Sequence, residues 1–180
     1  YRKAFADLDS QGMERLIVDL RDNPGGLLES VCEILRDILP EGLIVYTEDK
    51  EGNRTEEKCD GENELQLPLA VLVNESSASA SEIFAGAVQD YGIGTIVGTT
   101  TYGKGVVQSI RQLNDGSAVK LTIANYYTPK GKNINKIGIK PDIEVSLDNN
   151  LLNKTRDEIT HDEDNQLQAA IKEVMKNRTE

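Results

Sequence analysis

The chain has 180 residues, 38% of them hydrophobic, and a formal net charge of −11 at pH 7. This length suffices for one sizeable core, and no linker-like stretch divides the chain into two domains. The acidic balance argues against a nucleic-acid partner, because phosphate binding needs clustered basic side chains. No apolar run approaches the roughly 20 residues that a membrane-spanning helix needs.

The first half of the chain alternates predicted strands with predicted helices. Hydrophobic spacing and turn residues predict, in chain order, a helix over Tyr1–Gln11, a strand over Leu16–Leu20, a helix over Leu28–Leu39, a hairpin of Leu43–Thr47 and Arg54–Cys59, a strand over Leu69–Val73, a helix over Ser79–Asp90 and a strand over Thr95–Gly98. This alternation is typical of an α/β fold with a mainly parallel sheet and flanking helices. We expect the hairpin to project from that sheet.

The second half has a different pattern. It predicts two alternating strands, Val106–Leu113 and Ser117–Tyr127, then a short strand over Asp142–Val145 and a last helix from about Asn165 to Lys176. A loop rich in lysine and asparagine separates the paired strands from the short one.

The two cysteines and the single histidine give little functional information. Cys32 falls on an apolar helical face and is expected in the core, whereas Cys59 lies in a polar hairpin. Their spacing matches no metal motif, and a disulfide between them stays open. His161 lies in an acidic tail far from the other polar motifs, so a serine nucleophile in this chain would take a lysine as its base.

Three polar loops are expected to share one crevice. If the strands 16–20, 69–73 and 95–98 are parallel and connected by right-handed crossovers, their carboxyl ends lie at one edge of the sheet. The loops leaving those ends are Arg21–Gly26, Asn74–Ser79 and Thr99–Gly105. Open α/β sheets bind their ligands in the crevice at this edge.

Each loop carries a group suited to acyl transfer. Ser79 opens a helix, so the N–H of Ala80 points out of a positive helix end that suits an oxyanion. The turn at Gly25 brings bare backbone and an N–H toward a substrate. Lys104 can accept a serine proton if burial keeps its amine neutral, and Gln108 can hold that amine without adding charge.

Each of these residues also has a purely structural interpretation. Ser79 and Glu82 fit the capping box S-x-x-E, so the serine can simply cap its helix. Lys104 alone is more often a solvated loop residue. The segment Gly98–Lys104 fits the start of a phosphate-binding loop, but Gly105 replaces the hydroxyl residue that binds magnesium and a strand follows instead of a helix. The nucleotide-binding interpretation is therefore rejected.

Several ungapped motifs together resemble the carboxyl-terminal processing, or tail-specific, serine peptidases. They are the segments 20–26 (LRDNPGG), 74–90 with its SASASE core, 101–108 (TYGKGVVQ), 127–131 (YTPKG) and 138–142 (GIKPD). The resemblance covers nearly the whole chain. It implies a crotonase-like and Clp-protease-like α/β core that cuts peptide bonds with a serine–lysine dyad, through an acyl-enzyme and without metal or other cofactor.

The resemblance also assigns roles to individual residues. Ser79 is similar to the family nucleophile, Lys104 to its general base and Gln108 to the residue that orients the lysine. Gly25 and Ala80 resemble the two backbone donors of the oxyanion hole, and Asp90 matches a supporting aspartate. The sequence departs from the family at two positions outside this set, Tyr102 and Lys132, where phenylalanine and arginine are usual.

The remaining expectations concern the whole protein. The resemblance implies that residues 1–180 are a catalytic core without the PDZ domain and core strands that precede it in the family, and that the enzyme acts outside the bacterial cytoplasm, as a periplasmic, secreted or membrane-anchored protein. Expected partners are protein or peptide substrates with free carboxyl termini, and a sheet edge left open by the missing strands can pair with a second copy. The competing hypothesis is a catalytically inactive relative that binds peptides or acts as a scaffold.

Overall fold

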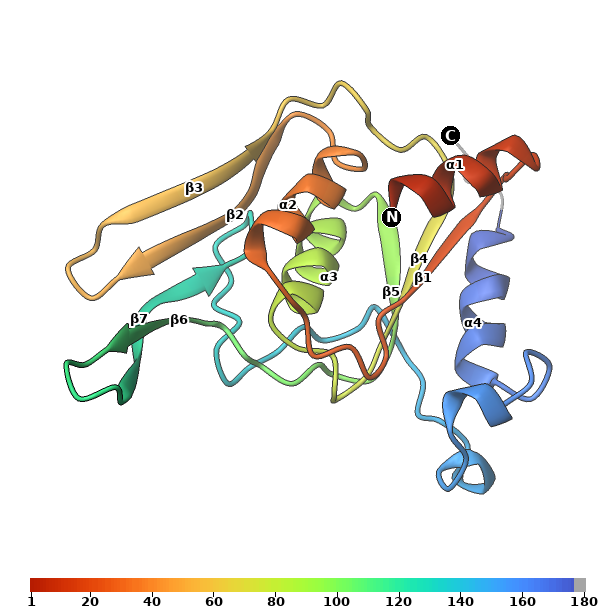
Figure 1. Cartoon of the computed structure of the whole chain (residues 1–180). Coiled ribbons are helices and arrows are strands. Elements are labelled where there is room, and N and C mark those ends of the chain that lie inside the picture. The colour runs from red at the N-terminus through yellow and green to blue at the C-terminus, as the bar shows by residue number, and fades with distance from the viewer. Residues whose placement is uncertain (177–180) are drawn as a thin grey trace.

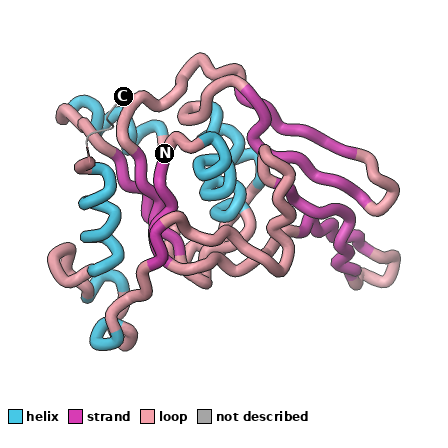
Figure 2. Tube along the Cα trace, turned by 180° about the vertical axis from the view of Figure 1, so that it is seen from behind, coloured by secondary structure: helices cyan, strands magenta, loops and turns pink. Residues whose placement is uncertain are grey.

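The computed structural model describes residues 1–176, which form layers of helix and sheet (Figure 1). The elements are α1 (Arg2–Ser10), β1 (Leu16–Asp19), α2 (Leu28–Arg36), β2 (Gly42–Asp49), β3 (Arg54–Cys59), β4 (Leu69–Val73), α3 (Ala80–Tyr91), β5 (Gly94–Gly98), β6 (Val106–Gln112), β7 (Ala118–Tyr127), β8 (Ile143–Glu144), two 3₁₀ turns (Asn149–Leu151 and Arg156–Glu158) and α4 (Asn165–Val174). Seen from either side, α2 and α3 lie between two sheets, and α4 covers the far face of one of them (Figures 1 and 2).

The first sheet is parallel and has the strand order β1-β4-β5-β8. Leu16 pairs with Leu69, and Leu69 pairs with Gly94, so the three strands predicted as neighbours are neighbours. Their carboxyl ends therefore meet at one edge, as expected. The α/β class with a parallel sheet and flanking helices is confirmed.

The predicted hairpin belongs to a second sheet. Strands β3, β2, β7 and β6 form an antiparallel sheet in that order, with β2 joined to β7 by the pairing of Tyr46 with Tyr127. The rings of these two tyrosines stack with centroids 4.8 Å apart. Pairing across 81 positions of sequence left no local signal, and for this reason the sequence predicted a hairpin projecting from the parallel sheet but not its pairing with β7.

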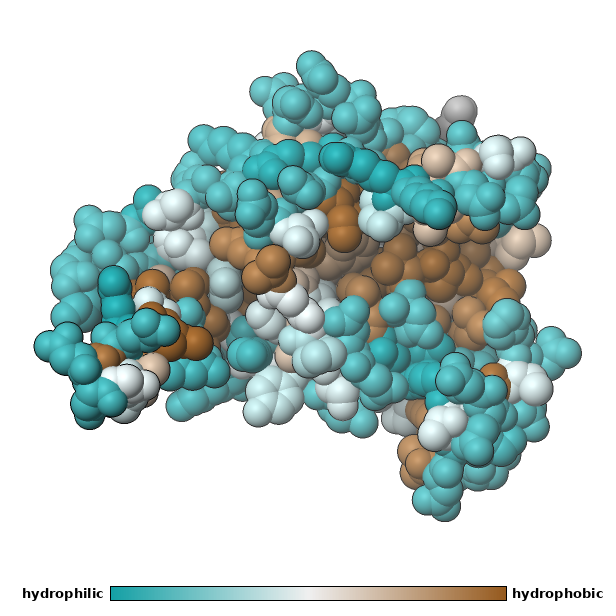
Figure 3. Space-filling model, in the orientation of Figure 1, coloured by the Kyte–Doolittle hydropathy of each residue, from teal (hydrophilic) through white to brown (hydrophobic). Residues whose placement is uncertain are grey.

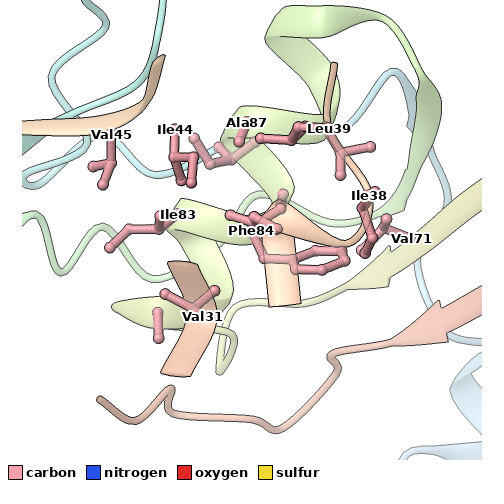
Figure 4. Close-up of a cluster of buried hydrophobic side chains, with 14 of the residues drawn as sticks. Val31, Ile38, Leu39, Ile44, Val45, Val71, Ile83, Phe84 and Ala87 are labelled. Atoms are coloured by element: carbon pink, nitrogen blue, oxygen red, sulfur yellow. The ribbon is translucent and has the colours of Figure 1, made fainter. Parts of the chain in front are cut away.

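The strand β4 carries the core on both of its faces. All five of its residues are buried, and alternate side chains point to opposite sides of the sheet. Val71 joins a large cluster with Phe84 of α3 and Val31 of α2 (Figure 4), whereas Leu72 packs with Ala170 of α4. A strand buried on both faces reads as a continuous apolar run, which explains why LAVLV shows no alternation.

Both cysteines are buried, including the one that lies in the polar hairpin. Cys32 is buried in α2 as predicted, but Cys59 is also buried, at 5% exposure, and its Sγ lies 3.3 Å from the carbonyl oxygen of Leu39. The end of β3 turns inward beneath α2, although the rest of the strand is polar. Both thiols are free.

Candidate active site

Ser79 occupies a sharp turn between β4 and α3. Its backbone has φ 56° and ψ −116°, a conformation that residues other than glycine rarely adopt. Such strain persists only where surrounding contacts enforce it, and it concentrates at functional sites. Enzymes of the α/β-hydrolase fold expose a nucleophilic serine on a strained strand-to-helix turn of this kind.

Gly25 packs directly against this turn. A Cβ placed on Gly25 would lie 2.5 Å from the carbonyl oxygen of Ala78, 2.7 Å from the backbone nitrogen of Ala80 and 3.0 Å from Cβ of Ser79. Gly25 also has φ +90°, which favours glycine. The two predicted oxyanion donors, Gly25 and Ala80, thus lie side by side next to the serine.

The two donors differ in their present hydrogen bonds. The Ala80 N–H has no acceptor within residues 1–176, so it is free to bind an oxyanion. The Gly25 N–H donates to Oδ1 of Asn23 at 2.9 Å. For Gly25 to serve as an oxyanion donor, a bound substrate must displace the Asn23 side chain.

Hydrogen bonds between the first two loops fix this arrangement. The carbonyl oxygen of Asn23 accepts from the Ala78 N–H at 3.0 Å and from Oγ of Ser81 at 3.1 Å. The Asn74 side chain accepts from the Asp22 N–H and donates to the Asp22 carboxylate. Segments separated by about fifty positions are therefore held together by one main-chain hydrogen bond and three that involve side chains.

Glu82 joins the third loop to the serine turn. Its side chain is fully buried, and its carboxylate accepts hydrogen bonds from Oγ1 of Thr101 (2.6 Å), the Gly103 N–H (2.6 Å), the Lys104 N–H (2.8 Å) and the Ser79 N–H (2.9 Å). The capping box between Ser79 and Glu82 is formed as well. Capping is thus one part of a larger network that sets where Lys104 lies relative to Ser79.

Lys104 and Gln108 are exposed in this structure. Neither Nζ of Lys104 nor the Gln108 side chain makes a hydrogen bond or ion pair within the described residues. Lys104 starts the approach to β6, and Gln108 lies on that strand. The backbone of Lys104 is anchored beside Ser79 through Glu82, while its side chain is free to move.

Asp90 lies at the opposite end of α3 from Ser79. Eleven residue-to-residue steps of about 1.5 Å each separate the two by roughly 16 Å along the helix. Its buried carboxylate accepts from the Lys130 N–H at 2.8 Å and pairs with Nζ of Lys132 at 3.2 Å. Asp90 therefore holds the segment after β7 and is remote from the three loops of the crevice.

An apolar hollow of 240 Å³ opens beside Gly25 and Ala80. Its walls include Leu20, Val31 and Phe84. On the face drawn in Figure 3, hydrophobic side chains are visible in the space between α2 and β1. A hollow of this kind accommodates an apolar side chain next to the donors that bind the carbonyl of the same residue.

Ser79, Gly25 and Ala80, predicted from the sequence to share one crevice, lie next to one another in the structure, whereas the contacts between Glu82 and Thr101 were not predicted. The spacing of Ser79 and Glu82 signalled a helix cap, and nothing local indicated that the same carboxylate binds a loop twenty residues later.

Cys32 is not a competing nucleophile, because burial and the charge of Glu57 raise the pKa of its thiol to about 11. None of the helices in residues 1–176 is long and apolar enough to span a membrane.

The chain matches peptidase family S41 over residues 1–145. It is 46% identical over 168 residues to the carboxyl-terminal-processing protease of Synechocystis sp., covering 93% of this chain and 38% of that protein. It is 42% identical over 145 residues to the chloroplastic C-terminal processing peptidase of Tetradesmus obliquus, covering 80% of this chain and 31% of the relative. The chain thus spans about a third of the length of these relatives.

A solved structure shows the same fold. The photosystem II D1 C-terminal processing protease superposes with a TM-score of 0.75 at 42% identity, covering 81% of this chain and 38% of that protein. Its matching core supports the assignment of the sheet and its flanking helices.

Proposed function

Because the chain belongs to peptidase family S41, we propose that it is the catalytic core of a serine endopeptidase that cuts protein substrates near their carboxyl termini. The observation that carries the proposal is the packing of Gly25 against the strained Ser79 turn, with the Ala80 N–H uncommitted. An acyl transfer needs a nucleophile next to backbone donors for the oxyanion; the Ala80 N–H offers one, and the Gly25 N–H would offer a second once substrate displaces the Asn23 side chain.

In the proposed mechanism, Oγ of Ser79 attacks the scissile carbonyl carbon while its proton passes to Nζ of Lys104. The N–H groups of Gly25 and Ala80 stabilise the resulting oxyanion. Collapse of this intermediate breaks the C–N bond, and the leaving amine takes the proton from Lys104. A water molecule then attacks the acyl carbon and gives a proton to Lys104. The bond between the acyl carbon and Oγ of Ser79 breaks, the carboxylic acid product leaves, and Lys104 returns the proton to Oγ of Ser79.

Substrate binding has to make two changes at the site: it must remove water from the Lys104 amine and release the Gly25 N–H from Asn23. Lys104 is exposed, and a lysine becomes an efficient base only when its amine is desolvated. A polypeptide lying over the 99–105 loop would cover that amine. The same substrate would place its carbonyl oxygen where Asn23 Oδ1 now accepts from Gly25. Gln108 is proposed to orient the amine in that state.

The apolar hollow beside the two donors is proposed to bind the side chain of the residue whose carbonyl is attacked. Its walls carry no charged side chain, so an acidic or basic residue there would lose its hydration without gaining a partner. Cleavage after medium-sized apolar residues is the expected preference.

The test compares peptide cleavage by the full-length protein with that by its Ser79→Ala variant. Ser76→Ala is the matched control, since Ser76 is an exposed serine in the same loop. We expect loss of cleavage by more than about a thousandfold in Ser79→Ala and an unchanged rate in Ser76→Ala. Mass spectrometry of a slow ester substrate should detect an acyl group on the peptide that contains Ser79. Equal cleavage by all three proteins would remove Ser79 from the mechanism.

A non-catalytic peptide-binding or scaffold protein is the second candidate. It is favoured by the exposed Lys104 side chain, which makes no bond to Ser79 within residues 1–176, and by the occupied Gly25 N–H. The same experiment separates the candidates, because a scaffold binds the peptide without turnover.

The relatives include bacterial and chloroplastic processing proteases, and we propose an extracytoplasmic location for this protein. We also propose that its substrates have free carboxyl termini and that their selection depends on sequence outside residues 1–180. A homo-oligomer formed through a sheet edge also stays a prediction.

A further inference from the structure

The strand β6 leaves one edge of its sheet unpaired. In the order β3-β2-β7-β6, β6 has β7 on one side and no strand on the other within residues 1–176. It begins at Val106, two positions after Lys104, and continues for 7 residues. Figure 1 shows the strand leaving the region below α3 and extending away from it beside β7. The open edge is thus continuous with the candidate active site.

The pairing with β7 determines which backbone groups face this open edge. The Leu113 N–H donates to the Ser117 carbonyl at 2.8 Å, and the Tyr126 N–H donates to the Gly105 carbonyl at 2.8 Å. Hydrogen-bonded and non-hydrogen-bonded positions alternate along an antiparallel pair. The odd-numbered residues of β6 therefore bond to β7. The even-numbered residues, Val106, Gln108, Ile110 and Gln112, direct their N–H and C=O groups outward.

The opposite edge of the same sheet is protected, whereas β6 is not. Exposed edges are commonly blocked by charged side chains, because an open ladder pairs with any extended chain. The β3 strand carries Arg54, Glu56 and Lys58 in an ion-paired row. The β6 strand has a single charged residue, Arg111, and presents Ile110 at 67% exposure. Figure 3 shows hydrophobic side chains gathered over this end of the molecule.

We propose that the open edge of β6 binds the main chain of the polypeptide substrate as an added β-strand. The inference rests on the proposed peptidase function, which requires an extended chain to lie across Ser79 and Lys104. Pairing with the outward groups of β6 would guide that chain past Lys104 and hold it in a fixed register. It would bind the backbone of any sequence, leaving side-chain selection to other contacts.

If the main chain of a peptide pairs with β6, every second peptide N–H donates to the strand. Blocking the N–H groups one at a time should therefore weaken binding at every second residue. The probe is a fluorescent peptide of about twelve residues that the wild-type protein cleaves, titrated by anisotropy against full-length Ser79→Ala protein. A series of peptides carries one N-methyl group at successive positions, each at least two residues from the scissile bond. We expect the Kd to rise about tenfold at alternate positions and less than about threefold at the positions between them.

A proline substitution tests the same idea on the protein. Ile110→Pro removes one outward N–H from β6, a position where an edge strand tolerates proline. Glu56→Pro is the matched control, since Glu56 occupies the equivalent outward position on β3. The Asp49 N–H donates to the Asn53 carbonyl, so that pair is hydrogen-bonded. By alternation along the strands, Tyr46 and Glu56 form a non-hydrogen-bonded pair, and the backbone groups of Glu56 face the open edge of β3. We expect Ile110→Pro to raise the Kd about tenfold and Glu56→Pro less than twofold. Circular dichroism and thermal unfolding of both variants check that the sheet is intact.

The outcomes separate this inference from the proposed function. Cleavage by wild-type protein with no two-residue alternation, or equal effects of the two prolines, would overturn substrate pairing at β6 and leave the peptidase in place. Loss of self-association in Ile110→Pro with unchanged peptide Kd would show that β6 pairs with a second copy instead. Alternation in the Kd series, with the parent peptide cleaved equally by wild-type and Ser79→Ala protein, would contradict the proposed peptidase function of Ser79 and keep the edge as a peptide-binding site.

Discussion

The backbone N–H of Lys104 donates a 2.8 Å hydrogen bond to Oε2 of Glu82, the same oxygen that accepts from the Ser79 N–H at 2.9 Å. One buried oxygen thus holds the backbones of the proposed base and the proposed nucleophile. No cation pairs with this carboxylate within the described residues; all its donors are three N–H groups and one hydroxyl. The relative position of Ser79 and Lys104 depends on a residue that is expected to take no part in the reaction.

Replacing Glu82 by glutamine should impair turnover more than substrate binding. The amide turns one acceptor into a donor that faces N–H donors, so at least one hydrogen bond is lost and the 99–105 loop shifts. We expect kcat to fall about a hundredfold, because small displacements of reacting groups have large kinetic costs. The free energy of unfolding should fall by about 2 kcal/mol. The measurements are peptide cleavage and urea unfolding.

Glu75→Gln provides the control for that variant, since Glu75 is an exposed carboxylate in the loop before α3 and accepts from Thr99. Its rate should stay within twofold of wild type. Equal kcat for Glu82→Gln and wild type would show that the network has no influence on the geometry of the site.

Gly25→Ala should reduce acylation without unfolding the protein. The added methyl group would lie 2.7 Å from the Ala80 nitrogen and 2.5 Å from the Ala78 oxygen, so the turn must open and the two donors separate. Loss of one oxyanion donor typically lowers kcat by about a hundredfold or more. Gly26→Ala is the neighbouring control, because a Cβ there meets nothing within 4 Å. Similar acylation rates for both variants would argue against a donor role for Gly25.

Stability should fall in acid partly through Asp164. Burial alone would raise the pKa of this carboxyl, but hydrogen bonds from Arg21 and from the Leu167 N–H outweigh it and hold the pKa below its usual value. Since the folded pKa is lowered, the stabilisation is fully present above the unfolded value of about 3.9 and is lost as the pH falls through the folded value.

The free energy of unfolding of Asp164→Asn should therefore be lower than that of wild type by about 2 kcal/mol at pH 7. As the pH falls below about 4, the free energy of unfolding should decrease less in the variant than in wild type. Asp162→Asn is the control, because Asp162 is exposed and close in sequence. Parallel pH profiles for Asp164→Asn and wild type would exclude this ion pair as a source of acid sensitivity.

Thiol reagents should leave peptide cleavage unchanged. Burial first, and then the charge of Glu57, raise the pKa of Cys32 to about 11, with Arg36 opposing the shift. At pH 8 about one thiol in a thousand would then be ionised, and Cys59 is buried as well. Labelling by a chromogenic disulfide should proceed only as fast as the protein unfolds. Rapid labelling with loss of cleavage would show that a cysteine is accessible near the site.

The sequence by itself determined the parallel sheet and the gathering of the three loops. Periodicity identifies the strands at Leu16, Leu69 and Thr95, and the handedness of crossovers then leaves one edge where their loops can meet. The short-range constraints of Ser79 and of the turn at Gly25 are likewise local, since a helix start and a glycine turn are visible in neighbouring residues. The strands, the helix start and the turn follow from residues a few positions apart, and the gathering of the loops follows from how those strands are connected.

Only the tertiary structure decided how Glu82 binds the 99–105 loop, how Cys59 becomes buried and how the hairpin joins β7 in a second sheet. Each of these depends on contacts between distant segments, whose energies come from burial and from satisfying polar groups that no local pattern specifies. A carboxylate three residues after a serine reads as a helix cap in either case. Which further donors reach it is settled when the loops close over it and water is excluded.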